Sequence, residues 1–228
     1  MTFKNKSLEI LSSSEMINLA EFIVKENFKH HTKGSLPSNY YSSIQSIYKE
    51  ELGFSKNSKV FVSKNDKGEI QGAIRVLRWD YSRKLPIQKI FGINPIEIAG
   101  MSPLKTIWHI GRFAIKKEVS DINLFKKLMI CAISPICEKE NSVAFAECDS
   151  KLLRVLRILG IEATVVGEAV NYLGSETIPV CMTYSGLIGF YRKNKHLIFK
   201  SIDDSSVKKS KLPKSVVVDS QLVNYTLV

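Results

Sequence analysis

Two side chains that can accept a proton lie in apolar runs of this sequence and could act as general bases. His109 stands in the run from residue 106 to residue 115, and its ordinary pKa of about 6.5 suits proton transfer near neutral pH. Glu147 ends the run from residue 143 to residue 148, where burial would make the carboxylate a stronger base. A lone histidine in an apolar run is more often a packing residue, so the sequence leaves open which of the two accepts the proton.

Two arginines, Arg75 and Arg112, fall in predicted strands that we expect to be close in one sheet. A guanidinium can hold a carboxylate through two parallel hydrogen bonds, as an amino-acid substrate would require. Each arginine could instead form a structural ion pair, and the sequence does not separate these interpretations. The four cysteines have no metal-ligand spacing, and the neighbouring His30 and His31 point apart, so we predict no metal site.

Hydrophobic periodicity predicts the elements that position these residues. The order is helix, helix, hairpin, strand, helix, strand, helix, strand, strand, which favours an α/β fold. We expect a mixed, mostly antiparallel central sheet with helices on both faces. Helices are predicted at residues 14–28, 38–52, 124–137 and 152–159, with Gly53 and Gly160 as stops and with Asp149 or Ser150 as the cap of the last helix. A loop is predicted around Pro86 and Pro95. Strands are predicted at residues 59–62, 70–77, 106–115, 143–148, 163–166 and 178–184.

Composition indicates a folded, basic protein. The chain has 228 residues, 44% of them hydrophobic, and a formal net charge of +11. We expect one domain over residues 1–194 and a Lys-rich extension over residues 195–228, with a strand-like run at 216–218. No apolar stretch is long enough for a membrane span and the N-terminus does not resemble a secretory signal, so we expect a cytoplasmic location. The charge fits an acidic partner, which could be a nucleic acid, an anionic membrane or an acidic protein, and a solvated Lys-rich surface explains it equally well. We expect no nucleic-acid partner, because no recognition motif is present.

Three segments of the sequence resemble the GNAT acyltransferase superfamily, and within it the branch of acyl-homoserine-lactone synthases and long-chain N-acyl amino acid synthases. Residues 72–77 resemble the G-x-x-R-L strand of that branch, and residues 108–115 resemble its E-[LI]-[SG]-R-[FL]-A-[VI] strand. Residues 152–160, followed by 172–174 and 178–180, resemble the helix, the glycine and the strand that end the domain in that branch. The resemblance covers residues 8–192.

The resemblance implies that a fatty acyl group is moved from a phosphopantetheine thioester to a primary amine. The donor would be acyl carrier protein or coenzyme A, with no permanently bound cofactor, and the acceptor a small-molecule amine such as an amino acid. His109 or Glu147 would be the base, and Arg75 and Arg112 would orient the substrate. A splay at Gly111 would turn the backbone of the next residues toward the donor thioester; these residues are Phe113, Ala114 and Ile115.

The departures from the family pattern favour a carrier protein as donor. The segment 116–123 contains no glycine, whereas coenzyme A enzymes of the superfamily use a Gly-rich loop there to bind a pyrophosphate. Leu156 stands where such enzymes often have a tyrosine. We therefore expect Lys126 and Lys127 to contribute to docking an acidic acyl carrier protein, together with Lys151, Arg154 and Arg157, unless these helix faces are simply solvated.

Two alternatives stay open. One is a signal synthase of the acyl-homoserine-lactone type, which takes a sulfonium substrate. The family binds that substrate with paired aspartates, and the segment 42–52 has none. His109 also replaces the acidic residue of the family's second motif. The other alternative is a catalytically silent GNAT-like module that binds acyl groups or a partner.

Overall fold

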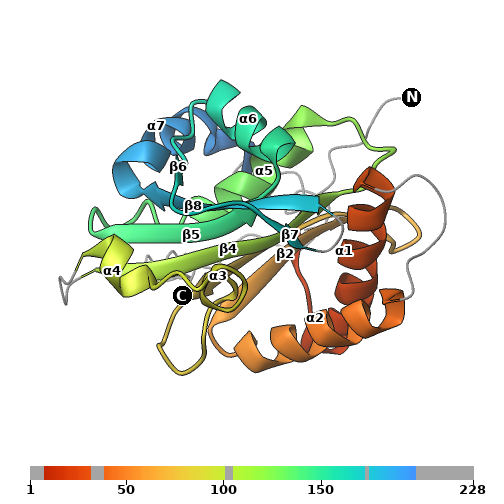
Figure 1. The fold of residues 1–228 in the computed structure, drawn as a ribbon. Coiled ribbons are helices and arrows are strands. Elements are labelled where there is room, and N and C mark those ends of the chain that lie inside the picture. Colours follow the sequence, from red (N-terminus) through yellow and green to blue (C-terminus); the bar gives the residue numbers. More distant parts are fainter. Residues whose placement is uncertain (1–7, 32–38, 101–104, 173–174, 199–228) are drawn as a thin grey trace, which may run out of the picture.

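An eight-stranded sheet organises the part of the chain that the structure describes, which is residues 8–31, 39–100, 105–172 and 175–198 of a computed structural model (Figure 1). The strand order is β1-β2-β3-β4-β5-β8-β6, and β7 pairs with β8. Every pair is antiparallel except β4 with β5, which confirms the predicted fold class. The strands are β1 (Glu9–Ile10), β2 (Ser58–Lys64), β3 (Ile70–Arg78), β4 (Thr106–Ile115), β5 (Ser142–Cys148), β6 (Thr164–Val165), β7 (Val170–Tyr172) and β8 (Ser175–Thr183).

Helices cover both faces of the sheet, as predicted (Figure 1). One face carries α1 (Met16–His31), α2 (Tyr40–Phe54), α3 (Pro86–Phe91) and α4 (Pro95–Ala99), and a 3₁₀ turn at Ser13–Glu15 precedes α1. The other carries α5 (Ile122–Ile133), α6 (Ser150–Ile158) and α7 (Tyr184–Asn194). Successive side chains of a strand point to opposite faces of the sheet. Alternate strand residues therefore contribute to separate hydrophobic cores on the two faces.

The structure corrects several predicted boundaries. The predicted loop around Pro86 and Pro95 contains two short helices, each with its proline in the first turn, where the missing N–H is not needed. Gly53 lies inside α2 instead of ending it, and α1 continues through His31. The chain after Thr183, expected to end a strand, forms α7, because the Thr183 hydroxyl accepts a hydrogen bond from Gly186 N and caps a new helix.

Local side-chain bonds explain the predicted elements that are confirmed. In the β2–β3 hairpin, the Asn65 side chain accepts from the backbone N–H groups of Lys67 and Glu69, and Gly68 has a φ of 80°, which favours glycine. Helix α6 begins where predicted because the Asp149 carboxylate accepts from Leu152 N. The predicted 216–218 strand lies outside the described residues, and the division at residue 194 stays a prediction.

A β-bulge interrupts β4 near its centre. Opposite the step from Ala73 to Arg75 on β3, the partner residues on β4 run from Ala114 to Gly111, so β4 carries one extra residue. Arg112 lies in this bulge and has a φ of 54°, an uncommon left-handed conformation for a side chain of its size. Pairing with β3 resumes at Ala114, so the bulge shifts the register of β4 by one residue and interrupts the ladder only at Arg112 and Phe113.

The two central strands separate just where the bulge begins. The parallel ladder between β4 and β5 starts at Thr106 with Ser142 and ends at Ile110 with Ala146, although both strands continue further. Backbone groups beyond that point have no partner in this ladder, so the sheet opens between its two middle strands. None of the helices in the described ranges is long and apolar enough to cross a membrane.

Candidate functional site

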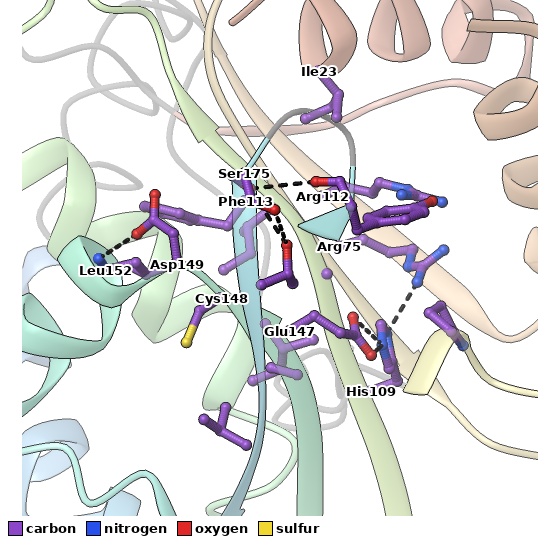
Figure 2. Close-up of a pocket in the computed structure, with 18 of the residues that line it drawn as sticks. Ile23, Arg75, His109, Arg112, Phe113, Glu147, Cys148, Asp149, Leu152 and Ser175 are labelled. Carbon is purple, nitrogen blue, oxygen red and sulfur yellow. Dashed lines mark hydrogen bonds and ion pairs between the residues drawn. The ribbon is translucent and has the colours of Figure 1, made fainter. Parts of the chain in front are cut away.

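A cavity of about 150 Å³ lies at this opening and draws its walls from both faces of the sheet (Figure 2). From the face covered by α5 come apolar side chains: Ile110, Met129, Ala146, Leu156, Val180 and Met182. From the opposite face come polar ones: Arg75, His109, Arg112, Glu147, Tyr172 and Thr177. The cavity thus joins an apolar half to a polar half across the gap between β4 and β5.

Three of the predicted site residues form one hydrogen-bonded series (Figure 2). Arg75 Nη2 lies 3.0 Å from His109 Nδ1, and His109 Nε2 lies 3.0 Å from each oxygen of Glu147. A guanidinium can only donate, so Nδ1 of His109 must accept, and the ring proton must sit on Nε2 and be donated to Glu147. This assigns a neutral histidine with both ring nitrogens occupied.

The series separates the roles of the two predicted bases. The His109 side chain is fully buried and has no free lone pair, whereas Glu147 lines the cavity and its side chain keeps 11% of its exposure. Each carboxylate oxygen has further lone-pair capacity beyond the bond from His109. Glu147 can therefore accept a proton from a group in the cavity while His109 holds it in place.

The two predicted substrate-binding arginines are already paired with acidic side chains from α2. Arg75 Nη1 and Arg112 Nε each donate to Glu51 Oε1 at 2.6 Å, and Arg112 Nη2 donates to Glu50 Oε1 at 2.6 Å. Burial opposes the charge on Arg112, but Glu51 and Glu50 together raise its pKa above the ordinary value. The two positive charges are balanced by two negative ones, which matches the structural ion-pair interpretation.

Glu50 and Glu51 were not predicted as site residues. A signal for Glu51 was present, because it follows Ile44 and Ile47 on the apolar stripe of its helix, where a charge must find a buried partner. Periodicity alone does not identify that partner. The absence of aspartate from the segment 42–52 therefore did not mean that the segment lacks buried acids.

Gly111 is needed for space and not for an unusual backbone conformation. A Cβ atom there would lie 2.9 Å from His109 Cε1 and 3.1 Å from Arg75 Nη2. The left-handed residue of the bulge is the neighbouring Arg112. The absence of a side chain at Gly111 thus allows Arg75 and His109 to approach within hydrogen-bond distance.

The predicted donor-facing backbone is only partly at the cavity. Phe113 lines it, whereas Ala114 and Ile115 pair with Ala73 and Gly72 on β3 and are not among the described residues that form its wall. The thioester-facing role of this segment therefore stays a prediction for Phe113 and for the bulge before it.

The segment after β4 is held by carboxylates where phosphate-binding amides would be expected. Lys117 N donates to the buried carboxylate of Glu26 at 2.8 Å. At the start of α5, Asn123 N donates to Asp121 Oδ1 at 2.8 Å. These two amides are already satisfied by anions, so they do not offer the free, electropositive donors that a pyrophosphate needs.

The predicted docking lysines differ from each other. Lys127 is only 9% exposed, which corrects the prediction that it lies on a solvated helix face, and Lys126 is half-buried. The α5 stripe is wider than the sequence pattern indicated, because this helix packs against both the sheet and α7. Lys151, Arg154 and Arg157 are exposed on α6, as expected.

Cys148 lines the cavity and is buried. Burial raises the pKa of the Cys148 thiol to about 12, which leaves it protonated and weakly nucleophilic near neutral pH. Among the described residues, no group of three His, Cys, Asp or Glu side chains could hold a metal ion.

The ion pairs with α2 predict a pH dependence of stability. Burial raises the pKa of Glu50, but the charges of Arg112 and Arg75 outweigh burial and hold it below the ordinary value of 4.5. A carboxyl whose pKa is lower in the folded state stabilises the fold above its unfolded pKa, and loses that contribution as the pH falls through the folded pKa. We expect the free energy of unfolding, measured with urea, to fall below about pH 5. The Glu50→Gln variant should show a shallower decline, and an identical slope in both proteins would contradict the pairing.

We compared the chain with protein-family models, curated proteins and solved structures. No family model and no curated protein matches the chain. Among solved structures, FeeM, an N-acyl amino acid synthase from uncultured soil microbes, has a TM-score of 0.56 at 14% identity, over 79% of this chain and 96% of its own. The AHL synthase LasI has a TM-score of 0.54 at 12% identity, over 82% and 96%. A protein of the GNAT family from Desulfovibrio desulfuricans has a TM-score of 0.50 at 11% identity, over 78% and 98%.

This chain has the GNAT fold. The similarity confirms the predicted fold, which is shared with an N-acyl amino acid synthase and with an AHL synthase, the two kinds of protein that the sequence resembles. In this GNAT fold, the bulge and the separation of β4 from β5 lie at the cavity, between the two faces of the sheet.

Proposed function

We propose that this protein is an N-acyltransferase that moves a fatty acyl group from the phosphopantetheine thioester of acyl carrier protein to the amine of a small molecule. The observation that carries the proposal is the cavity between β4 and β5, which joins an apolar half to a polar half containing Glu147. An acyl chain suits the apolar half, and a polar amine suits the other. The thioester carbonyl would then lie between them, at the bulge.

The reaction follows from that placement. Glu147 accepts a proton from the acceptor ammonium, and the neutral amine attacks the thioester carbonyl. The new C–N bond forms as the C–S bond breaks, and the departing pantetheine thiolate takes the proton that the nitrogen loses as it becomes an amide. Backbone N–H groups freed by the bulge near Phe113 stabilise the oxyanion. His109 and Arg75 act as positioning residues, because they fix the orientation of the Glu147 carboxylate.

The acceptor meets a polar half whose arginines are already neutralised. The Arg75 side chain is 0% exposed, so it contacts His109 and Glu51 in place of substrate. Arg112 also lines the cavity, but Glu50 and Glu51 already accept hydrogen bonds from it, so neither arginine is assigned to an acceptor carboxylate. Glu50 and Glu51 are both bound by arginines, which makes them poor partners for a sulfonium substrate and favours amide formation over lactone synthesis.

Mass spectrometry of lipids from cells overexpressing the chain tests the function directly. We expect N-acyl amines that are absent from cells expressing the Glu147→Gln variant. Purified protein given acyl carrier thioester with S-adenosylmethionine should form no lactone. A lactone would establish the signal-synthase alternative, and the absence of any acylated product in both experiments would leave a non-catalytic acyl-binding module.

We expect acyl carrier protein to be preferred over the matching acyl-CoA. The Glu26 and Asp121 carboxylates occupy the amides that would bind a pyrophosphate, and the net charge of +11 suits an acidic carrier. The Michaelis constant for the carrier should rise with salt, since exposed charges are screened over about 8 Å at physiological ionic strength. The Lys126→Glu variant should raise the Michaelis constant for the carrier further. Its Michaelis constant for a short pantetheine thioester should be unchanged.

Lys139→Glu is the matched control for this charge reversal, because Lys139 is exposed but precedes the start of β5, whereas the cavity lies at its end. Lys127 is left unchanged, since an acid at that buried position would disturb the fold. Equal use of both donors across the salt series, with no response to Lys126→Glu, would contradict the carrier preference.

A further inference from the structure

A second cavity, of about 200 Å³, lies on the α5 face of the sheet and shares no wall residue with the first. The strand register places its strand residues together, because Lys59 pairs with Val76 and Arg78 pairs with Trp108. Directly paired residues point to the same face of a sheet. The wall consists of Lys56, Asn57, Ser58, Lys59, Phe61, Val76, Arg78, Trp108, Cys131 and Pro135.

Three positive charges line this cavity and no acidic side chain does. Lys59 is half-buried, and Lys56 and Arg78 are exposed. Unlike the half-buried Lys64, which pairs with Glu9 and Glu15, Lys59 has no ion pair with any residue in the described ranges. A concave surface with unbalanced charge of one sign attracts ions of the opposite sign.

A polar atom without a partner lies in the same cavity wall. Trp108 Nε1 is buried and makes no hydrogen bond within the described part of the chain. The other tryptophan, Trp79, donates from its Nε1 to the backbone oxygen of Arg83 at 2.7 Å, as buried indoles usually do. This nitrogen is closed off from the cavity, so Trp108 contributes its ring to the wall and not its N–H.

The remaining wall is apolar. Phe61 and Val76 come from β2 and β3, and Pro135 follows α5. Cys131 is also apolar in character, since burial keeps its thiol protonated with a pKa raised to about 12. A ligand that fits must therefore carry both a negative head and an apolar body.

We propose that this second cavity binds a small amphipathic carboxylate, whose carboxylate faces Lys59 and Arg78 while its apolar body packs on Phe61 and Val76. A carboxylate balances the positive charge of Lys59 and Arg78, and charge-assisted hydrogen bonds of this kind are the stronger class. The small volume favours a short ligand. The proposal is independent of acyl transfer, because Trp108 and His109 are neighbours on β4 whose side chains point to opposite faces.

Tryptophan fluorescence provides a direct test, since the chain contains two tryptophans and the Trp79→Phe variant leaves Trp108 as the sole reporter. We expect octanoate to change the emission saturably. Octanol, which has the chain without the charge, and inorganic phosphate, which has the charge without the chain, should each bind at least about tenfold more weakly.

Variants of the cavity wall decide where octanoate binds. In the Trp79→Phe background, Lys59→Gln with Arg78→Gln should raise the dissociation constant about tenfold or more. Lys67→Gln, an exposed lysine in the turn at the other end of the same strands, should leave it unchanged. An octanoate response that survives the double substitution, or no saturable response at all, would overturn the proposal. Loss of acyl transfer in Glu147→Gln with octanoate binding intact would separate the two sites.

Discussion

Glutamine in place of Glu147 should lower kcat for acyl transfer by about 10²–10⁴-fold, the usual contribution of a positioned general base. The substitution keeps the shape of the side chain and one carbonyl oxygen for the bond from His109 Nε2, but an amide cannot accept the proton of the amine. The expected signature is a loss in kcat with an unchanged unfolding curve. Steady-state rates with acyl carrier thioester, measured from pH 6 to pH 9, give both the loss and its pH dependence.

The control for this variant is Glu176→Gln, because Glu176 is exposed on β8 and does not line the cavity. His109→Ala completes the comparison. If His109 only positions Glu147, this variant should lose less than Glu147→Gln, because water can still solvate the carboxylate. Near-full activity in Glu147→Gln together with a large loss in a folded His109→Ala would make His109 the base and contradict our assignment.

The second large effect concerns stability and the buried acid that joins both arginines. Glu51→Ala should lower the free energy of unfolding by about 3–5 kcal/mol, because the buried Arg75 loses its nearest carboxylate and must share Glu50, 3.7 Å away, with Arg112. Arg112 would keep Glu50 as its partner. Urea unfolding followed by circular dichroism measures the loss.

An exposed ion pair gives the control, since Glu9→Ala removes a carboxylate from Lys64 at the protein surface and should change stability little. A double variant, Arg75→Met with Glu51→Leu, separates charge from packing. Buried ion pairs replaced by apolar residues of similar size often lose no stability. We therefore expect this double variant to be more stable than Glu51→Ala, yet to lose activity, because His109 is no longer held. A small effect of Glu51→Ala would contradict the proposed energetic role of the pair.

Local patterns in the sequence determined most of the sheet. The predicted strands at 59–62, 70–77, 106–115 and 143–148 are all present and adjacent in the predicted order. Alternation and apolar runs are properties of consecutive residues, so they can be read without knowing the fold. The cap of α6 at Asp149 is also a local signal that can be read without knowing the fold. The two short helices that begin at Pro86 and Pro95 were not predicted, because they have too few residues to show a helical period.

The tertiary structure decided how the site residues are used. The sequence identified His109 and Glu147 as alternative bases, but only the pairing of β4 with β5 places them 3.0 Å apart and assigns them to one hydrogen-bonded series. The tertiary structure also shows that Glu50 and Glu51, on α2, together neutralise both predicted substrate-binding arginines, and that Lys127 is buried. These contacts join residues far apart in the chain. Their geometry depends on strand register, on one bulge and on helix docking, none of which the local sequence pattern specifies.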